Sequence, residues 1–147
     1  MQFGIPILAA VVATLTMTAF SHLTGTVIGM EFNEAHLLNR VFSKARGGEQ
    51  RKLRDNDPRG WLVHLIIGWV LAVGLRYIFL CPTFAKFLWV GSIFGIVAGL
   101  LGVAGWSIMF KKFGVPEGTG KRSFFLQLIG AHIVFATTCF AVFTLYD

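Results

Sequence analysis

Four long stretches of the chain contain no Asp, Glu, Lys or Arg, and charged segments separate them. These stretches cover residues 2–30, 61–75, 87–110 and 123–146. A bilayer core about 30 Å thick requires about 20 apolar residues in a helix, and three of the stretches reach that length as they stand. The second reaches it if Arg76 lies near the interface and the helix continues to Cys81. The pattern predicts four transmembrane helices, at about 5–27, 61–80, 87–110 and 124–145.

The fold class that follows is an all-α polytopic membrane protein. The four spans use most of the 147 residues, so we expect residues 1–147 to form a single transmembrane four-helix domain. Short connections make the second, third and fourth spans antiparallel neighbours. Residues 1–5 lack the basic segment of a signal peptide, and we therefore expect the first span to remain uncleaved.

Basic residues are distributed unequally between the two ends of the predicted bundle. The first and third connections together carry 11 of the 13 Lys and Arg residues, and only Arg76 and Lys86 belong to the other end. Basic loops face the cytoplasm, so both termini are predicted to lie on the periplasmic or outer side. The 11 residues are Arg40, Lys44, Arg46, Arg51, Lys52, Arg54, Arg59, Lys111, Lys112, Lys121 and Arg122.

The first connection contains the pattern of a short amphipathic helix. Asn33 is a suitable N-cap, Gly47 and Gly48 favour termination, and the residues between them place apolar side chains on one face. Such a helix lies in the cytoplasmic interface or packs under the bundle or against a partner, and the sequence leaves both placements open. The apolar face comprises Leu37, Leu38, Val41, Phe42 and Ala45.

Composition restricts the functional classes. Apolar residues make up 55% of the chain and charged residues 14%, which a soluble surface does not accommodate. The net charge of +6 is explained by basic loops beside anionic lipid headgroups, so we expect lipid contacts and no nucleic acid. Cys81 and Cys139 form no C-x-x-C pair, and zinc or iron–sulfur binding is unsupported.

A stripe of small residues follows one side of the third predicted span. Small residues allow a neighbouring backbone to approach closely in lipid, so the stripe predicts helix packing. The first span carries a matching stripe of Ala10, Thr14, Thr18 and Gly25, which makes it the expected partner. The glycines of the third span are Gly91, Gly95, Gly99 and Gly102.

Ionisable residues within the predicted spans are few, and none is acidic. The absence of Asp and Glu from the spans argues against an ion-coupled transporter, which needs a buried carboxylate. His64 and His132 suggest haem ligation between the second and fourth spans, but they differ in depth by about 8 Å at 1.5 Å per residue. The alternative, imidazoles that hydrogen-bond across helices, is the favoured interpretation.

Several polar and aromatic residues are predicted to lie in the cytoplasmic half of the membrane. Together they suggest a pocket for a quinone, a lipid headgroup or a pigment, and ordinary interhelical polar contacts explain them equally well. The candidate binding residues are His22, His64, Trp106, Gln127 and His132, with Trp61 nearby.

Five sequence fragments resemble a group of small uncharacterised bacterial inner-membrane proteins with four helices. They are residues 16–21, 37–39, 60–64 with Gly68, 127–132, and the pair Gly105-Trp106. The resemblance implies the bacterial inner membrane and the four-span topology, and it implies no activity. Where that group has a proline in the loop helix, this chain has Ala35.

No motif identifies a reaction, and we expect a non-enzymatic protein. The leading expectation is an accessory or structural subunit of a larger membrane complex, with a partner membrane protein or a homo-oligomer. The first alternative is a haem-, quinone- or pigment-binding redox protein that uses His64 and His132. The second is a small oligomeric channel or carrier, which the missing membrane carboxylates disfavour.

Overall fold

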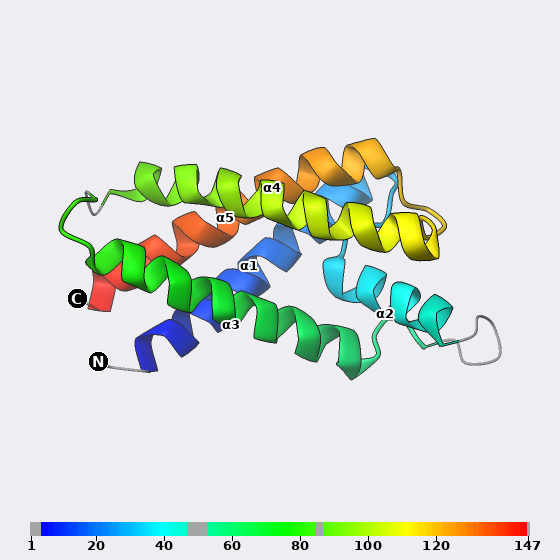
Figure 1. Ribbon diagram of the computed structural model, residues 1–147, viewed down its shortest axis with the longest axis horizontal. Helices are drawn as coiled ribbons and strands as arrows, with labels where there is room; N and C mark the ends of the chain where they lie inside the picture. The colour runs from blue at the N-terminus through cyan, green and yellow to red at the C-terminus, as the bar shows by residue number, and fades with distance from the viewer. Residues whose placement is uncertain (1–3, 47–52, 85–86, 147) are drawn as a thin grey trace.

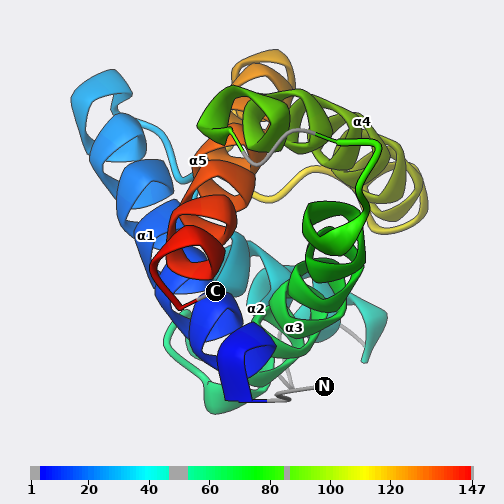
Figure 2. The same cartoon turned by 90° about the vertical axis from the view of Figure 1, so that its left-hand side faces the viewer.

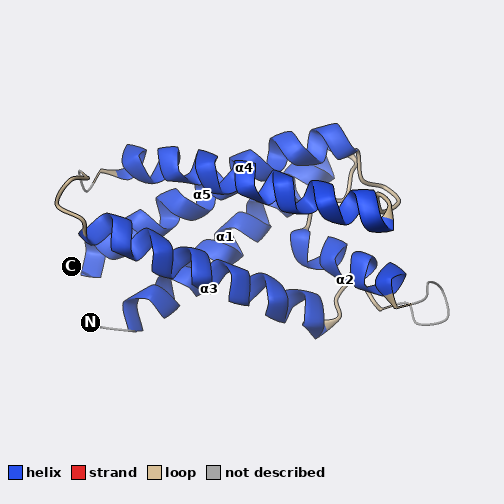
Figure 3. Cartoon of the chain, viewed as in Figure 1, coloured by secondary structure: helices blue, strands red, loops and turns tan. Residues whose placement is uncertain are grey.

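The chain folds into five α-helices, four of which are long. A computed structural model describes residues 4–46, 53–84 and 87–146, and every regular element in these ranges is helical (Figure 3). The helices are α1 (Gly4–Ile28), α2 (Glu34–Ala45), α3 (Pro58–Leu80), α4 (Leu88–Phe113) and α5 (Lys121–Tyr146).

The helices α1, α3, α4 and α5 are long and apolar enough to cross a membrane, with mean hydropathies of 1.8, 2.0, 2.1 and 2.0. The chain is therefore a polytopic membrane protein with an all-α fold, as the charge pattern predicts. The start of α1 and the end of α5 lie at one end of the bundle, and α2 lies at the other (Figure 1). We call this other end, which also carries the α4–α5 connection, the α2 end.

The helix boundaries differ slightly from the predicted spans. Asp57 caps α3 by accepting a 3.0 Å hydrogen bond from the Arg59 N–H, and Pro58 occupies its first turn. The helix therefore begins three residues before Trp61, and α5 likewise begins at Lys121 rather than at residue 124. Both extensions are polar turns, which hydropathy alone does not assign to a helix.

The last helix, α5, is the centre of the bundle. It packs against α4, α1 and α3, and its contact with α4 is the most extensive in the protein. The view along the bundle shows α5 beside α1 and α4, whereas α3 and α4 stand apart (Figure 2). These two consecutive helices make little contact with each other.

The glycine stripe of α4 faces α5, which corrects the expected pairing with the first span. A Cβ on Gly95 would lie 2.6 Å from Ile133 Cα, and one on Gly99 would lie 2.8 Å from Ile129 Cα. Gly91 lies against Phe140 in the same way. In the α1 stripe, Thr14 and Thr18 face α3 instead: a Cβ on Gly68 would collide with the Thr14 hydroxyl, and Thr18 Oγ1 lies 3.2 Å from His64 Nε2. Gly25 lies against Met30 and Phe32, in the segment that leads to α2.

The loop helix α2 forms as predicted and is buried rather than spread along the interface. Its cap, Asn33, accepts hydrogen bonds from the N–H groups of Ala35 and His36 at 3.0 and 3.3 Å. Leu37, Leu38 and Val41 are at most 5% exposed. The helix ends at Ala45, and the predicted terminators Gly47 and Gly48 lie outside the described residues.

Candidate functional site

Burial of α2 brings a carboxyl group into the transmembrane bundle. Glu34, the first residue of α2, is 2% exposed. The Ser21 hydroxyl of α1 donates a 2.7 Å hydrogen bond to Glu34 Oε1, and Gln127 Nε2 of α5 donates a 2.6 Å hydrogen bond to the Ser21 oxygen. Burial raises the pKa of Glu34 to about 7, although the hydrogen bond from Ser21 acts in the opposite direction. Glu34 is therefore poised to exchange a proton near neutral pH.

A cavity of about 170 Å³ lies beside Glu34, and all five helices contribute to its wall. Its polar lining residues are Thr14 of α1, Glu34 of α2, His64 of α3 and His132 of α5. Most of the remaining wall is apolar, and α4 contributes Trp106. For comparison, a cavity of about 150 Å³ accommodates a benzene molecule.

The cavity opens between α3 and α4, where these helices diverge. Ile67 of α3 lines it and is 47% exposed, and the exposed Gly105 of α4 lines it from the other side. Ile67 lies nine residues inside α3 and Gly105 eight residues before the end of α4, which places the opening about 12–14 Å along each helix. This depth is within the hydrocarbon region of a bilayer.

The hydrogen bonds of His64 fix its tautomer. The Thr18 hydroxyl donates its proton to the Thr14 carbonyl oxygen at 2.8 Å, so the same hydroxyl oxygen can only accept at the 3.2 Å contact with His64 Nε2. His64 therefore carries its proton on Nε2, and its Nδ1 has a free lone pair.

His132 adopts the opposite tautomer. Its Nδ1 lies 2.8 Å from the Leu128 carbonyl oxygen, which accepts only, so Nδ1 carries the proton and Nε2 is an acceptor. The ring faces the glycine stripe: a Cβ on Gly102 would lie 3.0 Å from His132 Cε1 and 3.3 Å from Nε2. Gly102 thus leaves the space that the imidazole occupies beside the cavity.

Three buried oxygen atoms have no hydrogen-bond partner among the described residues: Thr14 Oγ1, Glu34 Oε2 and Gln127 Oε1. Thr14 and Glu34 line the cavity, and their side chains are 1% and 2% exposed. Because a buried polar atom without a partner costs about 1–3 kcal/mol, the cavity wall has unused hydrogen-bonding capacity.

The structure brings together only part of the predicted pocket. His64, Trp106 and His132 line the same cavity. Gln127 is buried behind it and reaches Glu34 through Ser21. His22 is exposed on the outside of α1.

The size of the cavity favours a ligand smaller than a haem. A bis-imidazole haem needs a lone pair from each ring and a slot as wide as the macrocycle. The tautomers leave a lone pair on His64 Nδ1 and on His132 Nε2, but the cavity is about the size of one aromatic ring. Within the described part of the chain, no group of three His, Cys, Asp or Glu side chains is arranged to hold a metal ion.

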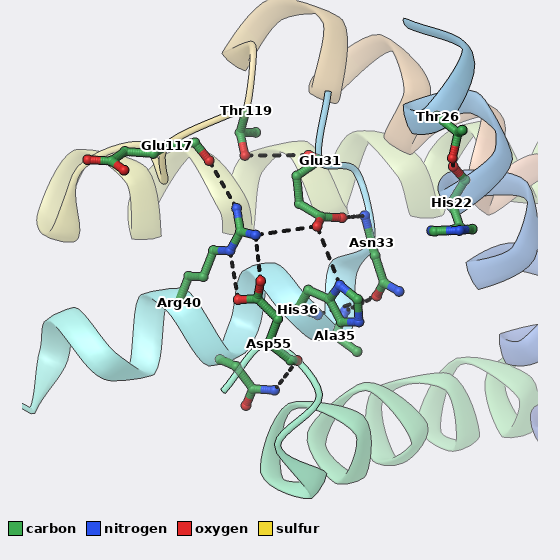
Figure 4. A network of polar contacts seen from close by, with 11 residues as sticks. His22, Thr26, Glu31, Asn33, Ala35, His36, Arg40, Asp55, Glu117 and Thr119 are labelled. Carbon is green, nitrogen blue, oxygen red and sulfur yellow. Dashed lines mark hydrogen bonds and ion pairs between the residues drawn. The ribbon is translucent and has the colours of Figure 1, made fainter. Parts of the chain in front are cut away.

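An ion-pair network outside the cavity fastens the α2 end. Arg40 donates from Nε and Nη2 to the two carboxylate oxygens of Asp55 at 2.9 and 2.7 Å, and Nη1 donates to the Glu117 carbonyl at 3.0 Å. Glu31 lies 3.4 Å from both Arg40 and His36. Figure 4 shows Arg40 between these groups, so that one side chain connects α2 to the segments before α3 and α5.

Sequence reasoning missed Glu34 as a site residue. The signal was present, because Glu34 precedes Leu37, Leu38 and Val41 by three, four and seven residues and therefore shares the buried face of α2. Comparison of the chain with protein-family models, with curated proteins and with solved structures finds no match.

Proposed function

We propose that this protein is a membrane-embedded binding protein that takes up a small molecule from the lipid phase. The observation that carries the proposal is the cavity of about 170 Å³, which opens between α3 and α4 and has the unpaired oxygens of Thr14 and Glu34 in its wall. A ligand that enters from lipid must be largely apolar, and one that satisfies these atoms must also carry a polar group. A small amphipathic molecule meets both requirements.

Filling the cavity tests this function. A Cβ on Gly105 meets no atom within 4 Å, so Gly105→Leu places a side chain at the opening without a clash. Gly74 of α3 also has nothing within 4 Å but does not line the cavity, and Gly74→Leu is the matched control. Native mass spectrometry of protein released from its own membranes should show a small bound molecule in the wild type and the control. Its equal retention in Gly105→Leu would contradict the proposal.

The orientation that we propose places the α2 end in the cytoplasm of a bacterial inner membrane, with both termini outside. The basic residues of this end support it, because Lys111, Lys112, Lys121 and Arg122 are exposed and can contact anionic headgroups. They would hold the cavity opening at a fixed depth.

We propose a role as an accessory subunit of a larger complex as the second candidate. The exposed basic surface of the α2 end supports it, whereas the glycine stripe is already occupied by α5 and is not free for a partner. Blue native electrophoresis of mildly solubilised membranes tests this role. A large complex should form with the wild type and disappear when Lys111 and Lys112 are both changed to Glu.

A further inference from the structure

The polar residues that line the cavity leave acceptor atoms unpaired. Glu34 Oε2 and Thr14 Oγ1 have no partner among the described residues, and the Thr14 hydroxyl can accept as well as donate. The tautomer set by the Leu128 carbonyl leaves His132 Nε2 as a third acceptor. A wall of this kind is complementary to a ligand that brings N–H or O–H donors.

The electrostatics of the cavity favour a cation. The described residues that line it include no Lys or Arg. The titratable groups around Glu34 are His64 from α3, His132 from α5 and the nearby carboxylate Glu31, whereas α1 and α4 contribute none. With the two imidazoles neutral, an ionised Glu34 gives the cavity a negative charge that no neighbouring group offsets.

The rest of the wall requires an apolar body of limited size. Met17, Leu38, Ile67, Leu71, Met109 and Phe135 surround the polar atoms. The cavity volume of about 170 Å³ is close to that which holds one benzene ring. One ring or a short branched chain, together with one ammonium group, fills it.

Resting on the binding function above, we propose that the ligand is a small protonated amine with an apolar body, and that it replaces a proton on Glu34. The ammonium group donates to Glu34 Oε2 and forms an ion pair with the carboxylate. Because one buried carboxyl group does not hold a proton and a cation together, binding releases the proton of the carboxylic acid.

The proton exchange has a defined pH dependence. Burial raises the pKa of Glu34 to about 7, so the carboxyl group is largely protonated at pH 6 and ionised at pH 8. An amine that remains cationic at both values therefore binds about tenfold more weakly at pH 6, where it must displace a proton. Above pH 8 the affinity should no longer change.

Benzylammonium chloride is a suitable probe, because it combines one aromatic ring with a primary ammonium group. Calorimetric titration of the whole protein in lipid nanodiscs should give tighter binding at pH 8 than at pH 6. Repeating the pH 6 titration in two buffers of different ionisation enthalpy should show release of about one proton per amine. Glu34→Gln should weaken benzylammonium binding at least tenfold and abolish proton release, while benzyl alcohol binding persists as the check that the cavity is intact.

The outcomes separate the amine class from the cavity itself. Benzyl alcohol bound as tightly as benzylammonium, or benzylammonium bound without proton release, overturns the amine proposal and leaves the binding function in place. If neither probe binds the wild type, and native mass spectrometry of the wild type shows no bound small molecule, both proposals fail. Proton release is measured on the wild type, so the test stands even if Glu34→Gln does not fold.

Discussion

The Ser21 hydroxyl donates a 2.7 Å hydrogen bond to Glu34 Oε1, and this contact ties the first turn of α2 to the last third of α1. Ser21 in turn accepts from Gln127 of α5 at 2.6 Å. Helices α1, α2 and α5 therefore meet at one buried carboxyl group. Such a group makes the stability of the protein sensitive to pH.

The pH dependence of stability is the first prediction. Glu34 has an ordinary pKa of 4.5 when unfolded and a pKa of about 7 when folded, so the folded state binds its proton more tightly. The contribution of Glu34 to stability should be greatest below pH 4.5, fall between pH 4.5 and 7, and level off above that range. The loss is on the order of 3 kcal/mol, at about 1.4 kcal/mol per pKa unit.

Thermal unfolding in mild detergent at pH 5 and pH 8 measures this effect. Glu34→Gln should lower the melting temperature at pH 5 relative to that at pH 8, compared with the same pair of values for the wild type, because glutamine does not titrate. The prediction is rejected if the melting temperatures of the wild type and the variant depend on pH in the same way.

Replacing Gly95 with Leu should weaken the bundle. The new side chain would meet the α5 backbone, since a Cβ alone would lie 2.6 Å from Ile133 Cα and 2.7 Å from the His132 carbonyl oxygen. Overpacking costs about 1–3 kcal/mol, and a helix backbone yields less readily than a side chain. The melting temperature should fall, whereas Gly74→Leu on α3, where a Cβ meets nothing within 4 Å, should leave it nearly unchanged. Equal melting temperatures would show that α4 and α5 can separate at no cost.

Asn39 should prove essential for holding α2 against the start of α3. It is fully buried, donates to the carbonyl oxygens of Asp55 and Asp57 at 2.8 and 2.9 Å, and accepts from the Gly60 N–H at 2.9 Å. Asn39→Ala leaves these groups unpaired, at about 1–3 kcal/mol. Hydrogen exchange should accelerate at residues 57–60. Asn39→Asp keeps the acceptor for Gly60 but places a buried carboxylate oxygen against the two carbonyl oxygens, so it should accelerate exchange at least as much as Asn39→Ala.

Membrane orientation can be tested by labelling one cysteine at each end of the bundle. The native Cys81 marks one end, and Glu117→Cys marks the α2 end. Cys81 is partly exposed after α3 and Cys139 is fully buried, so only Cys81 should react with a membrane-impermeant maleimide added outside whole cells. In a Cys81→Ser background, Glu117→Cys on the exposed α4–α5 connection should react only after the cells are opened. The reverse pattern would place the α2 end outside.

The spans could be predicted from the sequence because hydropathy depends on composition, which needs no knowledge of neighbours. Which helix packs against a given helix face does not follow from composition. Gly95 and Gly99 indicate that another helix approaches closely, but whether this helix is α1 or α5 depends on how all the helices pack together. Glu34 illustrates the same limit: its spacing to Leu37 and Val41 indicates a shared face, and only the packing of that face against the bundle makes this first-turn acid a buried carboxyl group.

The candidate pocket was only partly predictable for a related reason. His64 and His132 could be placed in the membrane by counting residues, but counting along a helix gives depth and not direction. His22 has a depth similar to that of its predicted neighbours and points outward. The cavity exists because α3 and α4, adjacent in the chain, make little contact, which contradicts the expectation that a short connection ensures close packing.

The central position of α5 has a consequence for how the protein is made. This helix packs against α1, α3 and α4, yet the ribosome synthesises it after all three of them. Until it inserts, Ser21 and Glu34 lack Gln127 and the α4 glycines lack the surface that they fit. Association of helices in lipid depends on such contacts, so the helices synthesised earlier remain in the membrane without α5 to pack against. A chain that stops before Lys121 should therefore remain an unassembled set of helices and be a substrate for membrane proteases.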